Sequence, residues 1–92
     1  MSGEKFDDLA KKLKALANKN RLGILYHIAD GESSVGQIEK VLDISQSALS
    51  QHLAVLRREN VVKTRRDAQT IYYTIEDDVI KQILAVLKTL CS

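Results

Sequence analysis

The sequence of 92 residues has no proline, no tryptophan and a single cysteine, Cys91. One thiol cannot close a disulfide within the chain or form a thiolate cluster, which excludes a disulfide-stabilised secreted domain and a cysteine-based zinc finger. No apolar run is long enough to span a membrane, and acidic Glu4, Asp7 and Asp8 stand where a signal peptide would be basic and then apolar. We therefore expect one soluble domain, residues 1–92, in the cytoplasm, with no membrane partner.

The chain is also poor in groups that carry out covalent chemistry. Its two histidines are His27 and His52, and His52 shares a predicted helix with serines at positions 45, 47 and 50. No acidic residue is placed to orient this imidazole, so a nucleophile, a base and an orienting group do not come together. We expect a protein that is not an enzyme and that needs no cofactor.

The net charge of +2 is unevenly distributed along the chain. Residues 45–75 carry five Arg and Lys against two acidic residues, whereas residues 21–44 carry two basic residues against four acidic ones. A concentration of positive charge in one segment favours a polyanionic partner, although a solvated surface gives the same pattern.

Helical patterns fill the first two thirds of the sequence. Apolar residues recur from Phe6 to Leu16 at spacings of three and four, which predicts an amphipathic first helix. A second helix is expected after residues 18–20, with Gly31 ending it in a left-handed cap. Ser34 is expected to begin a short third helix, because Gln37 lies three residues further on and completes a capping box.

Ser45 is the expected N-cap of a fourth helix that reaches about Glu59, so the third and fourth helices form a helix-turn-helix. Two strand patterns follow, VVKTRR and TIYYTI, joined through DAQ, and they predict a β-hairpin. A last helix is expected to begin near Asp77 or Asp78 and to run to Cys91. The predicted fold is mainly α with a two-stranded β-wing, a winged helix-turn-helix in the order helix, helix, helix, helix, strand, strand, helix.

The predicted fourth helix has two chemically different faces. At about 100° per residue, Leu49, Leu53 and Leu56 fall on one side, and small polar residues fall on the other. Serine and glutamine can hydrogen-bond base edges, and small side chains let a helix enter the major groove of double-stranded DNA. The residues predicted to contact bases are Gln46, Ser47, Ser50 and Gln51. Those predicted to contact the DNA backbone or to lie on the wing are Ser45, His52, Arg57, Arg58, Lys63, Arg65, Arg66 and Gln69.

Three segments carry a resemblance to a known family: LKALANKNRLGIL, SSVGQIEKVLDISQSALSQHLAVLRRENVV and RRDAQTIYYTI. Together they resemble the ArsR-type winged-helix repressors over residues 13–75, and SQSALSQHL is similar to the HlyU-like and BigR-like branch. The resemblance implies a homodimer built on the first and last helices, an operator with two-fold symmetry, and release of DNA when a signal is sensed.

Dimerisation is expected on apolar grounds as well. The last helix carries more apolar surface than a core of this size can cover, and the amphipathic first helix offers a second surface. The predicted interface residues are Phe6, Leu9, Leu13, Ile80, Ile83, Leu84, Leu87 and Leu90.

Two departures from the family pattern concern sensing. Many members bind metal through cysteines of the third helix or through aspartate and histidine ligands of the last helix, but this chain has no thiol in VGQIEKVLD and no histidine in its last helix. We therefore expect no metal site. The resemblance places a thiol pair in the HlyU-like and BigR-like branch, and Cys91 matches its second member. Tyr26 stands where the first is expected, so Cys91 is either a single redox-responsive thiol, helped by a neighbouring charge such as Lys88, or an inert residue.

A winged helix can also serve as a protein-interaction or assembly module without an operator of its own, and this is the alternative function. Such a module would present exposed apolar residues in place of the polar helix face and the basic wing.

Overall fold

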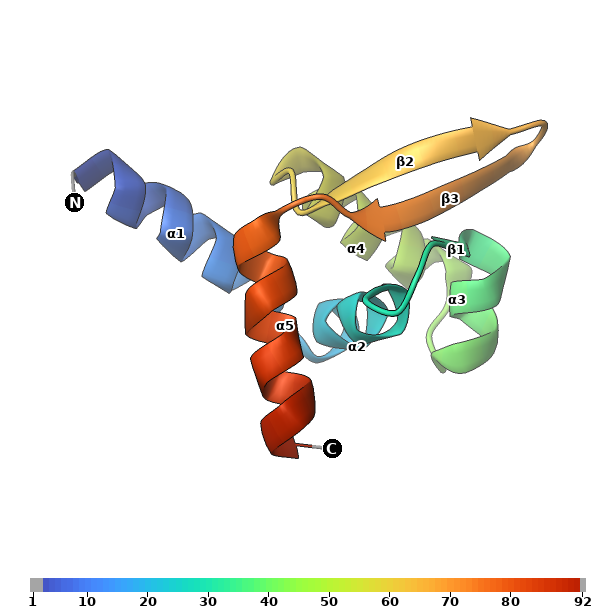
Figure 1. Cartoon of the computed structure of the whole chain (residues 1–92). Coiled ribbons are helices and arrows are strands. Elements are labelled where there is room, and N and C mark those ends of the chain that lie inside the picture. Colours follow the sequence, from blue (N-terminus) through green and yellow to red (C-terminus); the bar gives the residue numbers. More distant parts are fainter. Residues whose placement is uncertain (1–2, 92) are drawn as a thin grey trace.

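The computed structural model describes residues 3–91, which fold into five helices and three strands (Figure 1). The elements, in chain order, are α1 (Gly3–Leu16), α2 (Lys19–Ile28), β1 (Ser33–Ser34), α3 (Val35–Val41), α4 (Gln46–Arg58), β2 (Val62–Asp67), β3 (Thr70–Ile75) and α5 (Asp78–Cys91). The predicted order of helices and the predicted hairpin are confirmed, and the hairpin of β2 and β3 is the wing. Helices α3 and α4, which form the helix-turn-helix, begin and end close to the positions expected from the sequence.

Helix capping explains why the helices begin where they do. The side chain of Asn18 accepts hydrogen bonds from the backbone N–H groups of Asn20 and Arg21 at the start of α2. Ser34 and Gln37 form the predicted capping box of α3, and the Ser45 hydroxyl accepts from the Ala48 N–H at the start of α4. Each such cap satisfies N–H groups that the first turn of a helix leaves unpaired.

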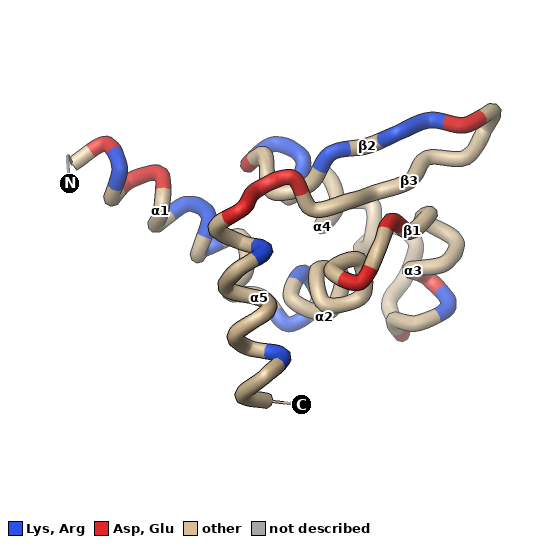
Figure 2. The backbone as a smooth tube through the Cα atoms, viewed as in Figure 1, with Lys and Arg blue, Asp and Glu red and all other residues tan. Residues whose placement is uncertain are grey.

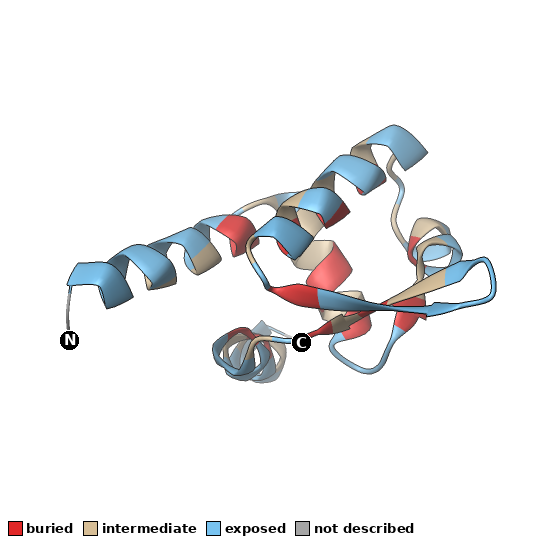
Figure 3. Ribbon diagram, turned by 90° about the horizontal axis from the view of Figure 1, so that it is seen from above, coloured by how far each residue is buried: buried red, intermediate tan, exposed pale blue. Residues whose placement is uncertain are grey.

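The hydrophobic core lies between the sheet and helices α2, α3 and α4, with α5 packed beside them (Figure 3). Leu49, Leu53 and Leu56 of α4 are buried, which confirms the apolar side of this helix as its core side. The other buried apolar residues are Ala15, Leu16, Ile24, Leu25, Ile28, Ile38, Val61, Val62, Tyr73, Ile75, Ile80 and Leu84.

The sheet has one strand more than the sequence predicted. Within residues 3–91 it is three-stranded, in the order β1-β3-β2, because Ser33 and Ser34 pair antiparallel with Tyr73 and Tyr72. A two-residue strand is too short to show period-two alternation, and Ser34 also caps α3, so its sequence signal is that of a helix start. The consequence is that the wing is hydrogen-bonded to the segment that leads into the helix-turn-helix.

Two turns also differ from expectation. Asp67 belongs to β2, so the hairpin turn is Ala68–Gln69, with Ala68 at a φ of 57°. Helix α2 ends earlier than expected, with Ala29 as a right-handed C-cap. The predicted left-handed cap at Gly31 is wrong: its φ is 156°, and it lies in the connection to β1. The Gly31 N–H donates to the Ile28 carbonyl across this connection.

Candidate nucleic-acid interface

The outward face of α4 is polar. Gln46, Ser47, Ser50 and Gln51 are all exposed, on the first two turns of the helix and opposite its buried leucines. Ala54 continues this exposed side by one further turn. The large exposed apolar side chains among residues 3–91 lie on other helices, namely α1, α3 and α5. The four residues predicted to contact bases are therefore brought together on one accessible surface, which we call the reading face.

His52 lies at the edge of the reading face and is held by a residue of α2. The Arg21 Nη1 atom is 3.4 Å from His52 Nδ1, while Arg21 Nε donates to the Ala15 carbonyl at 2.7 Å. Nη2 of the same guanidinium donates to the Lys14 carbonyl at 3.3 Å. Arg21 thus joins the last turn of α1 to α4, a role that no local sequence pattern signals because the partners are distant in sequence.

The environment of His52 sets its protonation. Burial of the imidazole, and next the positive charge of Arg21, lower the pKa of His52 below its ordinary value. A neutral ring allows Nδ1 to accept from the guanidinium and places the remaining proton on Nε2. The structure therefore gives His52 a supporting role for α4 through its contact with Arg21.

We predict that the free energy of unfolding falls as the pH drops below about 6.5, the usual pKa of histidine in an unfolded chain. Below that value the unfolded chain binds a proton on residue 52 that the folded protein resists, so this part of the stability is present above about pH 6.5 and is lost as the pH falls through the lowered pKa of the folded state. Urea denaturation at several pH values measures the effect. His52→Asn keeps an acceptor for Arg21 without a titrating ring, and an equally steep profile in that variant would assign the pH dependence to another group.

The wing carries basic side chains on both of its faces. Lys63 and Arg65 pair with Thr74 and Tyr72, whereas Arg66 pairs with Ile71 on the opposite face, because successive strand residues point to opposite sides. All three basic residues are exposed, and Gln69 lies exposed in the hairpin turn. The Arg65 guanidinium differs from that of Arg66 in being bound by the carboxylate of Glu32, a contact that the sequence did not predict.

The basic residues continue from the wing to the end of α4 (Figure 2). Arg57 and Arg58 are exposed in the last turn of this helix, and Arg58 Nε lies 3.6 Å from Glu59 Oε1. The chain then turns directly into β2, which bears Lys63, Arg65 and Arg66, while β3 carries no charged residue. We call these five residues the basic strip; in the chain they follow the polar reading face, from the last turn of α4 into β2. This arrangement is expected when cations hold phosphates and neutral polar groups meet bases.

The comparisons with known proteins identify the family. A model of bacterial regulatory proteins of the arsR family matches residues 18–64. The chain is also 50% identical over 78 residues to the transcriptional activator HlyU of Vibrio cholerae, an overlap of 85% of this chain and 72% of that protein. The chain belongs to the ArsR family. It is a DNA-binding transcriptional regulator and not an enzyme, as the sequence analysis predicted.

Solved structures agree with this assignment. HlyU from Vibrio cholerae N16961 matches this ArsR-family chain with a TM-score of 0.94 at 43% identity, covering 98% of each chain. The repressor BigR from Xylella fastidiosa matches with a TM-score of 0.87 at 33% identity, covering 100% of this chain and 98% of that one. The homodimeric winged helix-turn-helix domain Mb0332 from Mycobacterium bovis gives a TM-score of 0.83 at 30% identity, over 98% of this chain and 86% of the other. The predicted winged helix-turn-helix fold and the HlyU-like and BigR-like resemblance are confirmed.

In this ArsR-family chain, helices α1 and α5 present apolar side chains to solvent. Phe6 and Leu13 of α1 are 59% and 51% exposed, and Leu9 is half-buried. On α5, Val79, Val86 and Leu90 are exposed at spacings of seven and four, which places them along one face. We call the five exposed residues, Phe6, Leu13, Val79, Val86 and Leu90, the apolar stripes of α1 and α5.

Two of the predicted interface residues lie elsewhere. Ile80 and Leu84 are fully buried in the core of their own chain, so they are not available to a partner. Ile83 and Leu87 are half-buried between the core side and the exposed side of α5, and Leu90 is 75% exposed. The correction follows from helix geometry: the apolar residues of α5 form one broad face, and packing divides it into an edge that meets the core and an edge that stays exposed.

A salt bridge connects α1 to the start of α5. The Lys12 ammonium lies 2.5 Å from the Asp77 carboxylate, and Asp77 also accepts from the Ile80 N–H at 3.0 Å. Burial alone would raise the pKa of Asp77, but the hydrogen bonds from Lys12 and from Ile80 outweigh it and hold that pKa below its ordinary value. Asp77 therefore both anchors α1, through Lys12, and caps the first turn of α5, through the Ile80 N–H.

The region of the single thiol differs from what the sequence suggested. Cys91 is exposed at the end of α5. The Lys88 ammonium binds the Asp30 carboxylate at 2.7 Å and lies 5.7 Å from the centre of the Tyr26 ring, so its charge is already paired with an acidic group. Lys88 is thus engaged with α2 and the loop after it, rather than available to stabilise a thiolate at Cys91.

Neither a metal site nor a membrane span is found among residues 3–91. No group of three or more His, Cys, Asp and Glu side chains in this range is close enough to hold a metal ion. None of the helices in the same range is both long and apolar enough to cross a lipid bilayer.

Proposed function

We propose that this chain binds a specific double-stranded DNA operator as a homodimer, placing α4 of each protomer in successive major grooves and its wing beside them. The observation that carries the proposal is the reading face, where Gln46, Ser47, Ser50 and Gln51 stand exposed on the same helix whose last turn begins the basic strip. Amide groups and hydroxyl groups can both donate to and accept from base edges, which lysine and glutamate cannot. A protein-docking surface would require apolar residues there instead.

The apolar stripes of α1 and α5 support the homodimer. They expose Phe6, Leu13, Val79, Val86 and Leu90 on two helices at one end of the molecule (Figure 1), and a second copy related by a two-fold axis would cover both stripes at once. The homodimeric state named for Mb0332, a structural relative, agrees with this arrangement. A two-fold dimer in turn requires an operator of two inverted half-sites about one helical turn apart.

Binding of the dimer to promoter DNA is the step that regulates transcription in this proposal. We propose repression as its direct outcome, since a dimer on the promoter excludes other proteins from the same DNA. The relatives bear both descriptions, HlyU as an activator and BigR as a repressor. The same dimer would act as an activator where its binding displaces another repressor from a shared DNA site. Because the target is chromosomal DNA, we place this activity in the cytoplasm.

The operator can be found with purified protein. Fragmented genomic DNA is incubated with the full chain at moderate salt, the retained fragments are sequenced, and the site is footprinted. We expect an inverted repeat whose half-sites are centred about 10 base pairs apart, or a multiple of that distance. Retention of fragments without a common sequence would contradict a specific operator, and retention of none would contradict DNA binding by this surface.

For sensing, we predict that operator affinity changes little when the protein is treated with mild peroxide or polysulfide. The single cysteine cannot form an intrachain disulfide, and Lys88 is paired with Asp30. Any residual response must pass through Cys91, so Cys91→Ser is the matched control in the same titration. A large response that persists in Cys91→Ser would require a different sensor, whereas a large response abolished by this substitution would show that one thiol is enough.

A further inference from the structure

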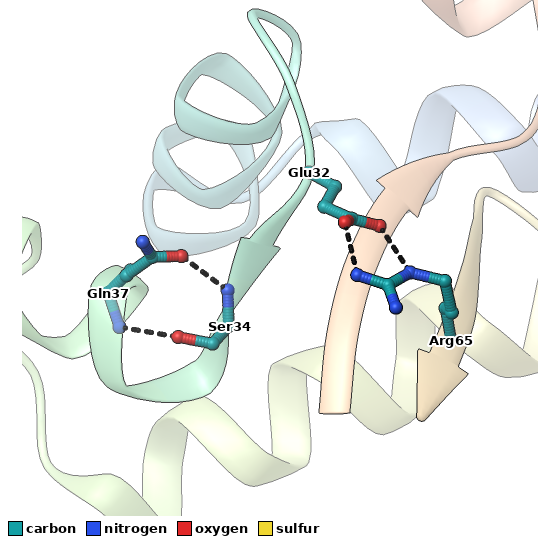
Figure 4. A network of polar contacts seen from close by, with 4 residues as sticks. All are labelled: Glu32, Ser34, Gln37 and Arg65. Carbon is teal, nitrogen blue, oxygen red and sulfur yellow. Dashed lines mark hydrogen bonds and ion pairs between the residues drawn. The ribbon is translucent and has the colours of Figure 1, made fainter. Parts of the chain in front are cut away.

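The side chains of Glu32 and Arg65 form a two-point contact across the sheet. Arg65 Nε donates to Glu32 Oε2 at 3.1 Å, and Nη2 donates to Oε1 at 2.5 Å (Figure 4). The same guanidinium lies over the ring of Tyr72, 4.6 Å from its centre. Two parallel hydrogen bonds and a ring face fix the guanidinium in position and in plane.

This contact spans the full width of the sheet. Arg65 of β2 pairs with Tyr72 of β3, and Tyr72 pairs with Ser34 of β1, so the guanidinium crosses β3 to reach Glu32, just before β1. The Ser34 hydroxyl then accepts from the Gln37 N–H, and the Ser34 N–H donates to the Gln37 side chain, beginning α3 (Figure 4). A side chain of the wing is thereby connected to the first turn of the helix-turn-helix.

The pairing limits what else Arg65 can bind. Glu32 neutralises its charge and occupies two of its five N–H groups, and a phosphate approaching the same group would meet the carboxylate. Arg66 is exposed on the opposite face of β2, where it pairs with Ile71. The two adjacent arginines of the wing are therefore not equivalent, although the same role was predicted for both.

We propose that Glu32 and Arg65 are positioning residues that hold the wing at a fixed angle to the helix-turn-helix, and that the phosphate contact of the wing is made by Arg66. The proposal rests on the DNA binding proposed above. Because the Arg65 and Glu32 side chains are 53% and 34% exposed to solvent, the pair adds little to global stability. Its effect is geometric: it keeps the wing and the reading face in register with one DNA duplex.

Reversal of the pair separates positioning from phosphate contact. Arg65→Glu and Glu32→Arg each place like charges opposite one another, and the double variant restores the pair with the charges exchanged. We expect Arg65→Glu to weaken operator binding by about tenfold or more, and the double variant to recover to within about threefold of the wild type. A double variant as weak as Arg65→Glu would show that the arginine itself is needed at position 65, and would overturn the proposal.

The salt dependence of binding gives a second readout. We expect Arg66→Ala to flatten the plot of log affinity against log salt by about one unit for each phosphate that is no longer neutralised, and Arg65→Ala to leave the slope unchanged. The matched control is the double variant Glu32→Arg with Arg66→Glu. Glu32 and Arg66 do not face one another, so exchanging their charges should not restore operator affinity. If Arg65→Ala flattens the slope as much as Arg66→Ala, Arg65 binds phosphate and the proposal fails.

Hydrogen exchange without DNA tests the positioning alone. The isosteric Glu32→Gln removes the charge with little risk to folding, and circular dichroism confirms that each variant is folded. We expect wing amides, including those of Thr64 and Tyr73, to exchange about tenfold faster in Glu32→Gln and in Arg65→Glu, and to be protected again in the double reversal. Unchanged exchange in every variant would overturn the positioning role. The expected exchange pattern in a protein that binds no DNA would instead support that role and count against the proposed function only.

Discussion

A Val86→Glu protein should be a folded monomer with little of the wild-type affinity for the operator. Val86 is 56% exposed within its own chain, so a carboxylate is tolerated there by the protomer. In the proposed dimer the same carboxylate would be buried against an apolar surface without a partner, at a cost that prevents association. Leu84→Glu, by contrast, should unfold the protein, because Leu84 is fully buried in the core.

The decrease in DNA affinity should be large because a monomer binds only one half-site. A dimer that contacts both half-sites at once has a higher affinity than a monomer on one half-site, by a factor on the order of 10² to 10⁴. Sedimentation velocity measures the oligomeric state, and an operator titration measures the affinity. Val41→Glu is the control for assembly, since Val41 is 58% exposed but lies on α3, away from the apolar stripes. A Val86→Glu protein that remains dimeric, or a wild type that sediments as a stable monomer, would contradict the proposed interface.

Replacement of the reading face should erode specificity more than affinity for DNA in general. We consider the single substitutions Gln51→Ala, Ser47→Ala and Ser50→Ala. For every hydrogen bond to a base that a variant cannot make, the free energy of binding to the operator should weaken by roughly 1 to 3 kcal/mol, and binding to random DNA should not change. Arg66→Ala should weaken binding to operator and random DNA alike, because a phosphate carries no sequence information. Gln51 and Arg66 are both exposed, so neither substitution should disturb the core.

Titration of each variant against operator and scrambled duplexes distinguishes these outcomes. The ratio of the two affinities should fall in Gln51→Ala and stay near the wild-type value in Arg66→Ala. A Gln51→Ala protein that keeps its full preference for the operator would show that the reading face is misassigned.

Local signals made most of the fold predictable. The capping box of Ser34 and Gln37 begins α3, and Ser45 caps α4. Because each cap bonds to a residue nearby in the chain, the sequence places both helices almost where the structure has them. The leucine spacing of α4 likewise identified its buried side and, by exclusion, the reading face. These features depend on contacts over short stretches of the chain, which periodicity and capping patterns describe well.

What could not be predicted depends on distant residues. Glu32 and Arg65 are 33 positions apart, and Arg21 and His52 are 31 positions apart, so no pattern within one element indicates either contact. Ile80 and Leu84 could not be separated from Val79 and Val86 because all four lie on one broad apolar face of α5. Only packing decides which of them face the core of the same chain and which remain for a partner.

The most direct test of operator recognition is the affinity of the wild-type protein for its footprinted genomic site and for a scrambled duplex of equal length, each titrated between about 50 and 300 mM salt. We predict that both affinities fall steeply with salt, as the basic strip requires, and that the genomic site is preferred by about a thousandfold or more near physiological salt. Equal affinities for the two duplexes at every salt concentration would contradict the assignment of α4 as a sequence-reading helix.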